Sequence, residues 1–193
     1  LTNEYTSILP HWATTLHTSQ KKTAFIPIST GCNQFCAYCI VPYARGMEKN
    51  MDTSQILTEV QHHIDTGIQE ITLLGQIVNK YPNFDQLCDD ILNLPGWLQW
   101  LRYTSPYPTF YSDRLLSLHE TQNHLCPHIH MPLQSGSDSV LKKMFRWYTR
   151  EEYIEFVDKI RGLKRDISLT TDIIVWFTDE TEEDFQQTLD LIE

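Results

Sequence analysis

The chain alternates between short apolar runs and segments with helical periodicity, and this alternation restricts the possible folds more than any other feature. Five apolar runs have the length of strands, and a helical pattern follows each of them. Strands that alternate with helices pair in parallel through right-handed crossovers. We therefore predict an α/β fold, an open partial (β/α) barrel with a parallel sheet and about five strand–helix units. The predicted strands are 24–30, 70–76, 98–105, 128–134 and 168–177.

Capping residues mark where several of the helices begin. Asp52 precedes a segment whose apolar residues recur every four positions. Ser112 is placed to cap another helix, and Thr149 with Glu152 has the spacing of a capping box. The last predicted helix covers 181–193.

Length and composition restrict the class of protein. Residues 1–24 are polar and aperiodic, so we expect a lead-in or linker there, followed by one core domain over 25–193. The chain has no apolar run near the roughly 18–20 residues that a membrane span needs, and its first residues lack the apolar core of a signal peptide. An odd number of cysteines, most of them clustered, indicates a reducing compartment. We expect a cytoplasmic protein without membrane association.

Charge is unevenly distributed along the sequence. The formal net charge is −10, which disfavours general binding of nucleic acid. Basic residues nevertheless concentrate between Lys142 and Arg165, whereas Asp172 to Glu193 contains only acidic charges. The basic segment is either a site for a polyanion or a solvated helix face, and the sequence leaves both interpretations open.

Three of the five cysteines, Cys32, Cys36 and Cys39, fall within eight residues after the first predicted strand. Four thiolates saturate a zinc ion or a cubane iron–sulfur cluster, whereas three leave one metal corner open. The spacing therefore favours a catalytic cluster whose open iron is chelated by a methionine-like ligand. A zinc site completed by Cys88, Cys126 or a histidine is a weaker alternative. A disulfide between residues this close is geometrically difficult.

Unusual residues follow each predicted strand. Because the carboxyl ends of parallel strands meet at one rim, we expect the functional site there. The segments concerned are the cysteine loop, Gly75-Gln76, 104–108, 134–137 and 176–180. His124, His128 and His130 alternate toward and along the fourth strand, which fits packed or exposed histidines better than metal ligands.

The Cys-x3-Cys-x2-Cys spacing resembles the signature of radical S-adenosylmethionine (SAM) enzymes, and Tyr38 before the third cysteine matches it too. Over about residues 24–193, five blocks resemble, in order, those of the methylthiotransferase family: GCNQFCAYCIVPYARGMEKN, EITLLGQIVNKY, RYTSPYP, HIHMPLQSGSDSVLKKMFRWYTREEY and TDIIVWFTDETEEDF. The most similar branch 2-methylthiolates isopentenyladenosine beside the tRNA anticodon. GQIVNKY at 75–81 and PLQSGSD at 132–138 carry that closer similarity.

This resemblance implies a [4Fe-4S] cluster on Cys32, Cys36 and Cys39. Such a cluster binds SAM at its open iron and cleaves it reductively to a 5′-deoxyadenosyl radical, which serves the methylthiolation of tRNA. An electron donor such as a flavodoxin-type protein would be a partner. Family members have a second [4Fe-4S] cluster in an N-terminal domain, a sixth strand and a C-terminal RNA-binding barrel. We expect none of these in residues 25–193, so tRNA would bind mainly through the missing parts.

The resemblance also implies SAM contacts at the rim. Tyr38 would lie near the adenine. The bare backbone at Gly75 would let the methionine end approach, although a tight turn also explains a glycine there. Gln134 would hydrogen-bond the ribose or carboxylate, and a plain polar turn explains this segment nearly as well. The expected cofactor-binding residues are Tyr38, Gly75, Gln76, Gln134, Ser135 and Asp172.

Several positions depart from the family pattern. The family has glycine where this chain has Trp147 and Trp176, and Pro and Gly at Thr178 and Asp179. Strand alternation would point the charged Asp172 into the barrel, and Trp176 with it, so that the indole would stack on SAM or crowd it. Two alternatives to the tRNA enzyme stay open: a ribosomal-protein aspartate methylthiotransferase, and a non-catalytic iron–sulfur module.

Overall fold

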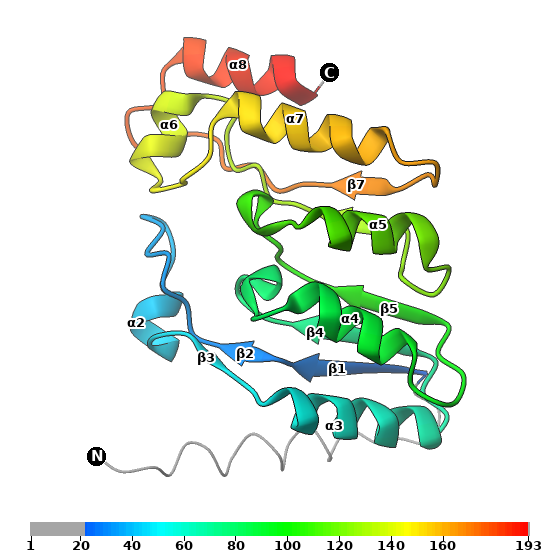
Figure 1. The fold of residues 1–193 in the computed structure, drawn as a ribbon. Helices are drawn as coiled ribbons and strands as arrows, with labels where there is room; N and C mark the ends of the chain where they lie inside the picture. Colours follow the sequence, from blue (N-terminus) through cyan, green and yellow to red (C-terminus); the bar gives the residue numbers. More distant parts are fainter. Residues whose placement is uncertain (1–21, 193) are drawn as a thin grey trace.

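The computed structural model describes residues 22–192, and parallel strands with helices on one side dominate it (Figure 1). Three strands pair in the order β1-β4-β5, and a parallel pair, β6 and β7, continues the row. An isolated parallel bridge between Leu101 and Leu125 links the two parts. The strands are β1 (Thr23–Pro27), β4 (Glu70–Leu74), β5 (Trp100–Tyr103), β6 (His128–His130) and β7 (Ser168–Thr170). The predicted open α/β sheet is confirmed.

The helices connect successive strands and cover one face of the row. In Figure 1, α3, α4, α5 and α7 lie in front of the strands, as right-handed crossovers require. A short antiparallel pair, β2 (Ser29–Thr30) and β3 (Lys49–Asn50), flanks the cysteine loop. The helices are α2 (Val41–Arg45), α3 (Thr53–Asp65), η2 (Val78–Lys80), α4 (Phe84–Leu92), η3 (Pro108–Phe110), α5 (Asp113–Thr121), α6 (Asp138–Lys143), α7 (Arg150–Arg161) and α8 (Glu182–Ile192).

Side-chain alternation along β1 separates a packed face from an open one. Ile26 is buried and registers with Leu73 of β4, which in turn registers with Tyr103 of β5. All three side chains belong to the apolar core under α3, α4 and α5. Phe25, one residue earlier, is 61% exposed on the opposite face. A second apolar core joins β6 to α6 and α7.

The capping residues act as the sequence predicts. The Asp52 side chain accepts a hydrogen bond from the Ser54 amide, and the Ser112 hydroxyl accepts one from the Leu115 amide. Thr149 and Glu152 form both bonds of a capping box. These bonds satisfy amides that the first turn of a helix otherwise leaves unpaired.

The fifth strand is shorter than predicted. β7 ends at Thr170, whereas the apolar pattern suggested a strand over 168–177. β7 pairs with β6 over only three residues, and beyond them a single bridge joins Gln134 to Ile173. Trp176 then adopts a left-handed conformation with φ +61°, which no strand tolerates. The other strands also lose a few residues at their ends, and β1 begins at Thr23, inside the expected lead-in, most of which lies outside the described residues.

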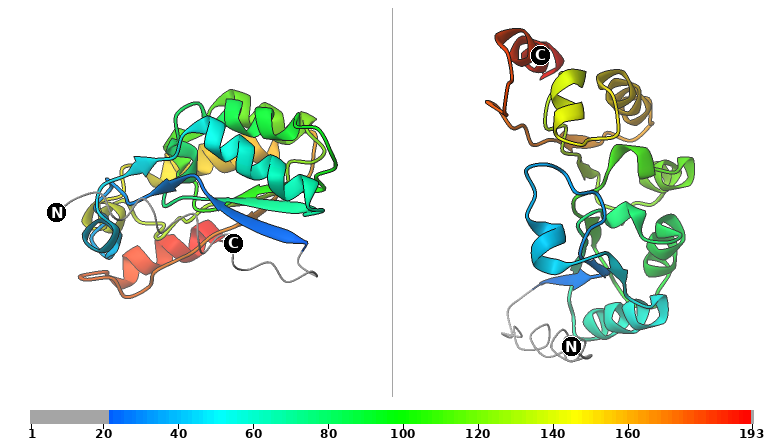
Figure 2. Two further views of the ribbon diagram at one scale, coloured as in Figure 1. Left: turned by 90° about the horizontal axis from the view of Figure 1, so that it is seen from below. Right: turned by 90° about the vertical axis from the view of Figure 1, so that its left-hand side faces the viewer.

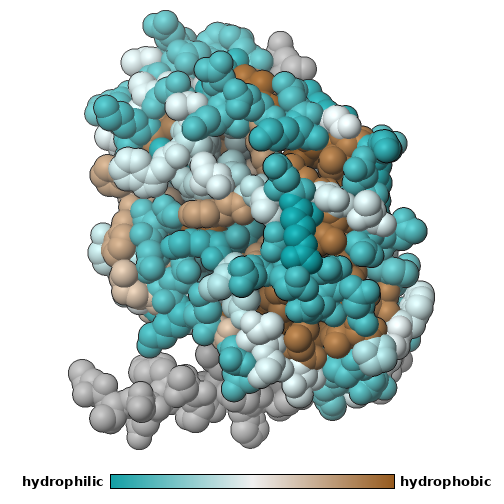
Figure 3. Space-filling model, viewed as in Figure 1, coloured by the Kyte–Doolittle hydropathy of each residue, from teal (hydrophilic) through white to brown (hydrophobic). Residues whose placement is uncertain are grey.

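Hydrophilic side chains cover most of the helix-bearing face, with apolar residues between them (Figure 3). Within residues 22–192, no helix has both the length and the apolar character needed to cross a membrane.

A polar network attaches α8 to the turn before α6. Asp184 is buried and accepts hydrogen bonds from the hydroxyls of Ser137 and Ser139 and from Thr181. These bonds, above all that from Ser137, hold the pKa of the Asp184 carboxyl well below its usual range. Gly136 lies so close to α8 that a Cβ would come within 2.6 Å of Thr188 Cα. Both features fix α8 against the turn.

Asp184→Asn should lower the free energy of unfolding at neutral pH, because a carboxylate accepts these bonds more strongly than an amide. The native pKa lies below the unfolded value of about 3.9, so the advantage of Asp184 is complete above that pH and is lost as pH falls through and below it. Urea unfolding of both proteins between pH 7 and pH 3 measures this. A stability difference that does not narrow toward low pH would contradict the assignment.

Candidate functional site

The carboxyl ends of the strands form one rim, and the cysteine loop lies on it. The arrowheads of β1, β4, β5 and β7 point the same way in Figure 1, and Figure 2 (right) looks onto that end, with the cysteine loop and α2 in front. The loop follows β2 and returns through β3. The rim predicted from the sequence therefore exists, with the three cysteines at one side of it.

Backbone contacts set the path of the cysteine loop. Gly31 has φ +73°, and a Cβ there would lie 2.3 Å from the Met47 carbonyl oxygen, so only glycine fits. The Cys32 amide donates to the Gly46 carbonyl at 3.1 Å, which closes the base of the loop. The Cys39 amide donates to the Cys36 carbonyl at 2.9 Å, so one tight backbone turn carries both residues.

The three cysteines of the loop differ in burial, Cys32 being buried and Cys36 and Cys39 half-buried. All are free thiols. Burial raises the pKa of the Cys32 thiol, and the nearby Cys36 and Cys39 raise it further, so three thiolates here need a cationic partner. In the part of the chain that the structure describes, no group of three His, Cys, Asp or Glu side chains has a geometry that could hold a single metal ion. A four-iron cluster spreads its ligands over separate irons, whereas zinc draws them to one point.

The other two cysteines lie apart from this loop. Cys88 is fully buried under the sheet in α4, and Cys126 is buried beside Arg102. Burial raises the pKa of both thiols. They behave as small apolar residues of the interior.

We expect Cys88→Ala combined with Cys126→Ala to leave the iron content of the anaerobically reconstituted protein unchanged. Stability should fall by about 1–3 kcal/mol, because each change removes a buried group. Iron analysis and visible absorption check this. As the matched change inside the trio, Cys36→Ala should lose most of the iron, and equal losses in both variants would contradict the assignment.

Gly75 and Gln76 follow β4, directly beside the base of the cysteine loop. A Cβ on Gly75 would lie 2.7 Å from Ser29 Oγ and 3.1 Å from Val78 Cα, so packing alone favours a glycine here. Gln76 is half-buried, and its Oε1 atom is buried without a hydrogen-bond partner. An unsatisfied buried acceptor is costly unless a ligand donor completes it. Gln76 thus has free acceptor capacity at the rim.

Gln134 and Ser135 follow β6 and form hydrogen bonds with different parts of the chain. Gln134 has φ +72°, and its amide and carbonyl bond Asp172 and Ile174 in the bridge to the last segment. Ser135 is fully buried, and its hydroxyl lies 3.3 Å from that of Thr188 in α8. The structure therefore brings Ser135 to α8, where it supports the turn.

A row of polar side chains crosses the open face of β6 and β7. His128 and His130 each bond the Thr170 hydroxyl at 2.9 Å, and His130 Nε2 lies 3.2 Å from Asp172 Oδ2. Asp172 itself is largely exposed. Asp172, which the sequence predicts to face the barrel interior, contacts His130 on this face, and both histidines bond neighbours in the sheet.

Tyr38 faces the segment after β7. Its ring contacts that of Phe177 edge-on, with centroids 6.5 Å apart. Trp176, next to Phe177, is 94% exposed in its left-handed conformation, so the alternation that would place it in the barrel fails. Asp179 is also left-handed, with φ +58°. The family that the sequence resembles has glycine at the positions of Trp176 and Asp179, because glycine adopts a positive φ without strain.

Trp176→Gly should raise the free energy of unfolding by up to about 1 kcal/mol, since release from the left-handed strain exceeds the entropic penalty of glycine. The matched control is Trp147→Gly, because Trp147 is also exposed, at 69%, but has no positive φ. That control should lose about 0.5–1 kcal/mol. Thermal unfolding of both variants decides the question, and destabilisation by Trp176→Gly would show that the indole packs.

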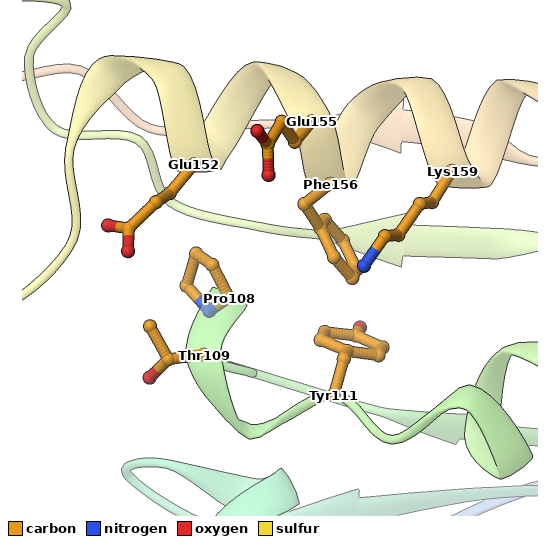
Figure 4. A pocket seen from close by; sticks show the side chains of 7 residues that line it. All are labelled: Pro108, Thr109, Tyr111, Glu152, Glu155, Phe156 and Lys159. Atoms are coloured by element: carbon orange, nitrogen blue, oxygen red, sulfur yellow. The ribbon is translucent and has the colours of Figure 1, made fainter.

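Sequence reasoning missed one residue of the rim, Arg146. Its guanidinium lies over the rings of Tyr107 and Tyr148 and reaches Cys36. Only its position within the basic segment drew attention to it. A separate pocket between η3 and α7 contains none of the predicted cofactor- or metal-binding residues, although Pro108 belongs to the predicted rim segment 104–108 (Figure 4). Its lining consists of Pro108, Thr109, Tyr111, Glu152, Glu155, Phe156 and Lys159.

An open parallel α/β sheet with three thiols on the loop after its first strand defines a class of protein, the radical SAM fold. The sequence profile of the radical SAM superfamily matches residues 26–192. The chain belongs to this superfamily.

Among solved structures, the cobalamin-dependent radical SAM enzyme OxsB with SAM bound superposes with a TM-score of 0.71, at 18% identity, over 88% of this chain and 26% of its own. The methyltransferase TsrM from Kitasatospora setae, with cobalamin and a [4Fe-4S] cluster bound, gives 0.72 at 17% identity, over 87% of this chain and 31% of its own. These similarities show the fold.

Curated relatives are closer in sequence. The tRNA-2-methylthio-N(6)-dimethylallyladenosine synthase of Desulfitobacterium hafniense is 46% identical over an alignment of 179 residues, and the match covers 89% of this chain and 40% of the relative. That of Carboxydothermus hydrogenoformans is 45% identical over 176 residues, covering 88% and 40%. The chain spans about 40% of the length of these relatives.

Proposed function

We propose that this chain is the catalytic core of a radical SAM methylthiotransferase that acts on isopentenyladenosine in tRNA. The observation that carries the proposal is the combination of three free cysteines on one rim loop with an unsatisfied buried acceptor, Gln76 Oε1, on the neighbouring strand end. The names of the relatives support the tRNA substrate.

Cys32, Cys36 and Cys39 would hold a [4Fe-4S] cluster with one open iron. When bound, the cluster supplies the electron that cleaves SAM reductively and so provides the radical chemistry of the superfamily. The loop has the required rigidity, because Gly31 and the Cys32–Gly46 hydrogen bond fix its base. Half-exposure of Cys36 and Cys39 leaves the outer side of the site accessible to SAM.

Side chains around the rim would orient SAM. Gln76 Oε1, which has no hydrogen-bond partner, would accept a charge-assisted hydrogen bond from the SAM ammonium. Asp172 is exposed on the inner face and would accept from ribose hydroxyls, with His130 holding its carboxylate. Gln134 would donate to the carboxylate, and Tyr38 would pack near the adenine. Gly75 allows the close approach, and Ser135 fixes the turn beneath Gln134.

The proposed reaction also needs a sulfur source and an electron donor, and we expect neither within residues 22–192. A second [4Fe-4S] cluster, as a sulfur source, would belong to an N-terminal domain, and a flavodoxin-type protein would deliver electrons. Free thiols on the rim suit a reducing cytoplasm. The ribosomal-protein methylthiotransferase is the second candidate for the same chemistry, and the relatives' names favour tRNA over it.

Anaerobic reconstitution with iron and sulfide, followed by SAM and dithionite, tests the enzymatic class. We expect 5′-deoxyadenosine in amounts that exceed a Cys36→Ala control. The same tRNA-free assay distinguishes the enzyme from a non-catalytic iron–sulfur module. A protein that binds iron fully and yields no 5′-deoxyadenosine would favour the latter.

Gln76→Leu should weaken SAM binding to the reconstituted protein about 10- to 100-fold, as expected for a lost hydrogen bond to a charged group of about 1.5–3 kcal/mol. Anaerobic calorimetry measures it. Gln99→Leu is the matched control, because Gln99 is exposed before β5, at the opposite end of the strands. Equal affinities of the two variants would exclude Gln76 from the SAM site.

A further inference from the structure

Arg146 follows α6 and turns its guanidinium toward the cysteine loop. The central carbon lies 4.5 Å from the centroid of the Tyr107 ring and 5.1 Å from that of Tyr148. Both tyrosines are buried, whereas Arg146 is only partly covered. Two aromatic faces attract and restrain a planar cation, so the position of this guanidinium is well defined.

Each nitrogen of Arg146 has a partner. Nε donates to Tyr148 Oη at 3.2 Å, Nη2 donates to the Pro132 carbonyl at 3.3 Å, and Nη1 donates to Cys36 Sγ at 3.8 Å. No carboxylate within residues 22–192 forms an ion pair with this arginine. The positive charge is therefore left for an anion at the loop, and the sulfur of Cys36 is the group it faces.

The backbone around Arg146 is attached to the same loop. The Ala37 amide donates to the Met144 carbonyl at 3.1 Å, and the Trp147 amide donates to Tyr107 Oη at 2.8 Å. Between them, Phe145 takes a left-handed conformation with φ +57°, which redirects the chain after α6. A strained residue held in place by bonds on both sides indicates that the direction of the next side chain is fixed.

We propose that Arg146 is a positioning residue that donates a hydrogen bond to the Cys36 thiolate and raises the reduction potential of the iron–sulfur cluster. The inference rests on the proposed function, because it requires the cluster on the three cysteines. A hydrogen bond to a ligand sulfur and a nearby positive charge both stabilise the reduced cluster, which carries one more negative charge. The tyrosine pair holds the guanidinium beside the sulfur of Cys36.

Arg146→Met removes the charge and the donor while keeping an apolar stem between the two rings. In an anaerobic redox titration followed by electron paramagnetic resonance, we expect the midpoint potential of the variant to fall. The expected shift is at least tenfold in the reduction equilibrium constant, which for one electron corresponds to about 59 mV. Arg146→Lys keeps the charge but loses the planar fork, and its potential should lie between the two.

Arg114→Met is the control for loss of a positive charge, because Arg114 pairs with Asp89 on the exposed side of α5. Its cluster should titrate like the unmodified protein. Should Arg146→Met fail to fold or to retain iron, Arg146→Lys decides, and a lysine variant with full iron and an unchanged potential overturns the proposal. An Arg146→Met protein with full iron and an unchanged potential overturns it as well. Failure of the unmodified chain to bind a cluster would instead overturn the proposed function.

Discussion

Parallel pairing of β1 with β4 is the interaction on which the site depends. Five residues of each strand register, from Thr23 with Glu70 to Pro27 with Leu74. Since both strands run the same way, the loop with the cysteines and the loop with Gln76 leave the sheet side by side. The close approach of Gly75 to Ser29 shows how tightly these two exits pack. A shift of register by one residue would exchange the buried and exposed faces and separate the cysteines from Gln76.

Local sequence signals predicted most of the fold, because the interactions behind them involve residues only a few positions apart and can be read from spacing. The caps at Asp52, Ser112 and Thr149 depend on a side chain and an amide within the same turn, and each forms as expected. The length of β7 depends instead on how many residues of β6 are available to pair with it. The residues within 168–177 carry no information about this. The apolar run continues past Thr170, whereas the pairing there is reduced to a single bridge between Gln134 and Ile173.

The same distinction separates the predicted from the unpredicted parts of the site. The three cysteines are neighbours in sequence, so their common loop could be inferred from spacing alone. Arg146 contacts Cys36 across more than a hundred residues, and its guanidinium lies over the ring of Tyr107 from another segment and over that of the nearby Tyr148. Ser135 shows the reverse case: a polar residue in a promising segment is engaged by Thr188 of α8, far along the chain. Long-range packing of this kind leaves no trace in residue spacing.

The exposed outer edge of β1 affects how residues 22–192 behave in solution. Among them, β1 pairs with β4 alone, so its other edge has no strand partner within these residues, and the ring of Phe25 beside it is exposed. Pro27, at the end of the strand, offers no amide hydrogen and shortens the usable edge, while β7, at the far end of the row, has only three residues. Edge-to-edge aggregation of these residues would therefore begin at the first three or four residues of β1, and a charged side chain in place of Phe25 would oppose it.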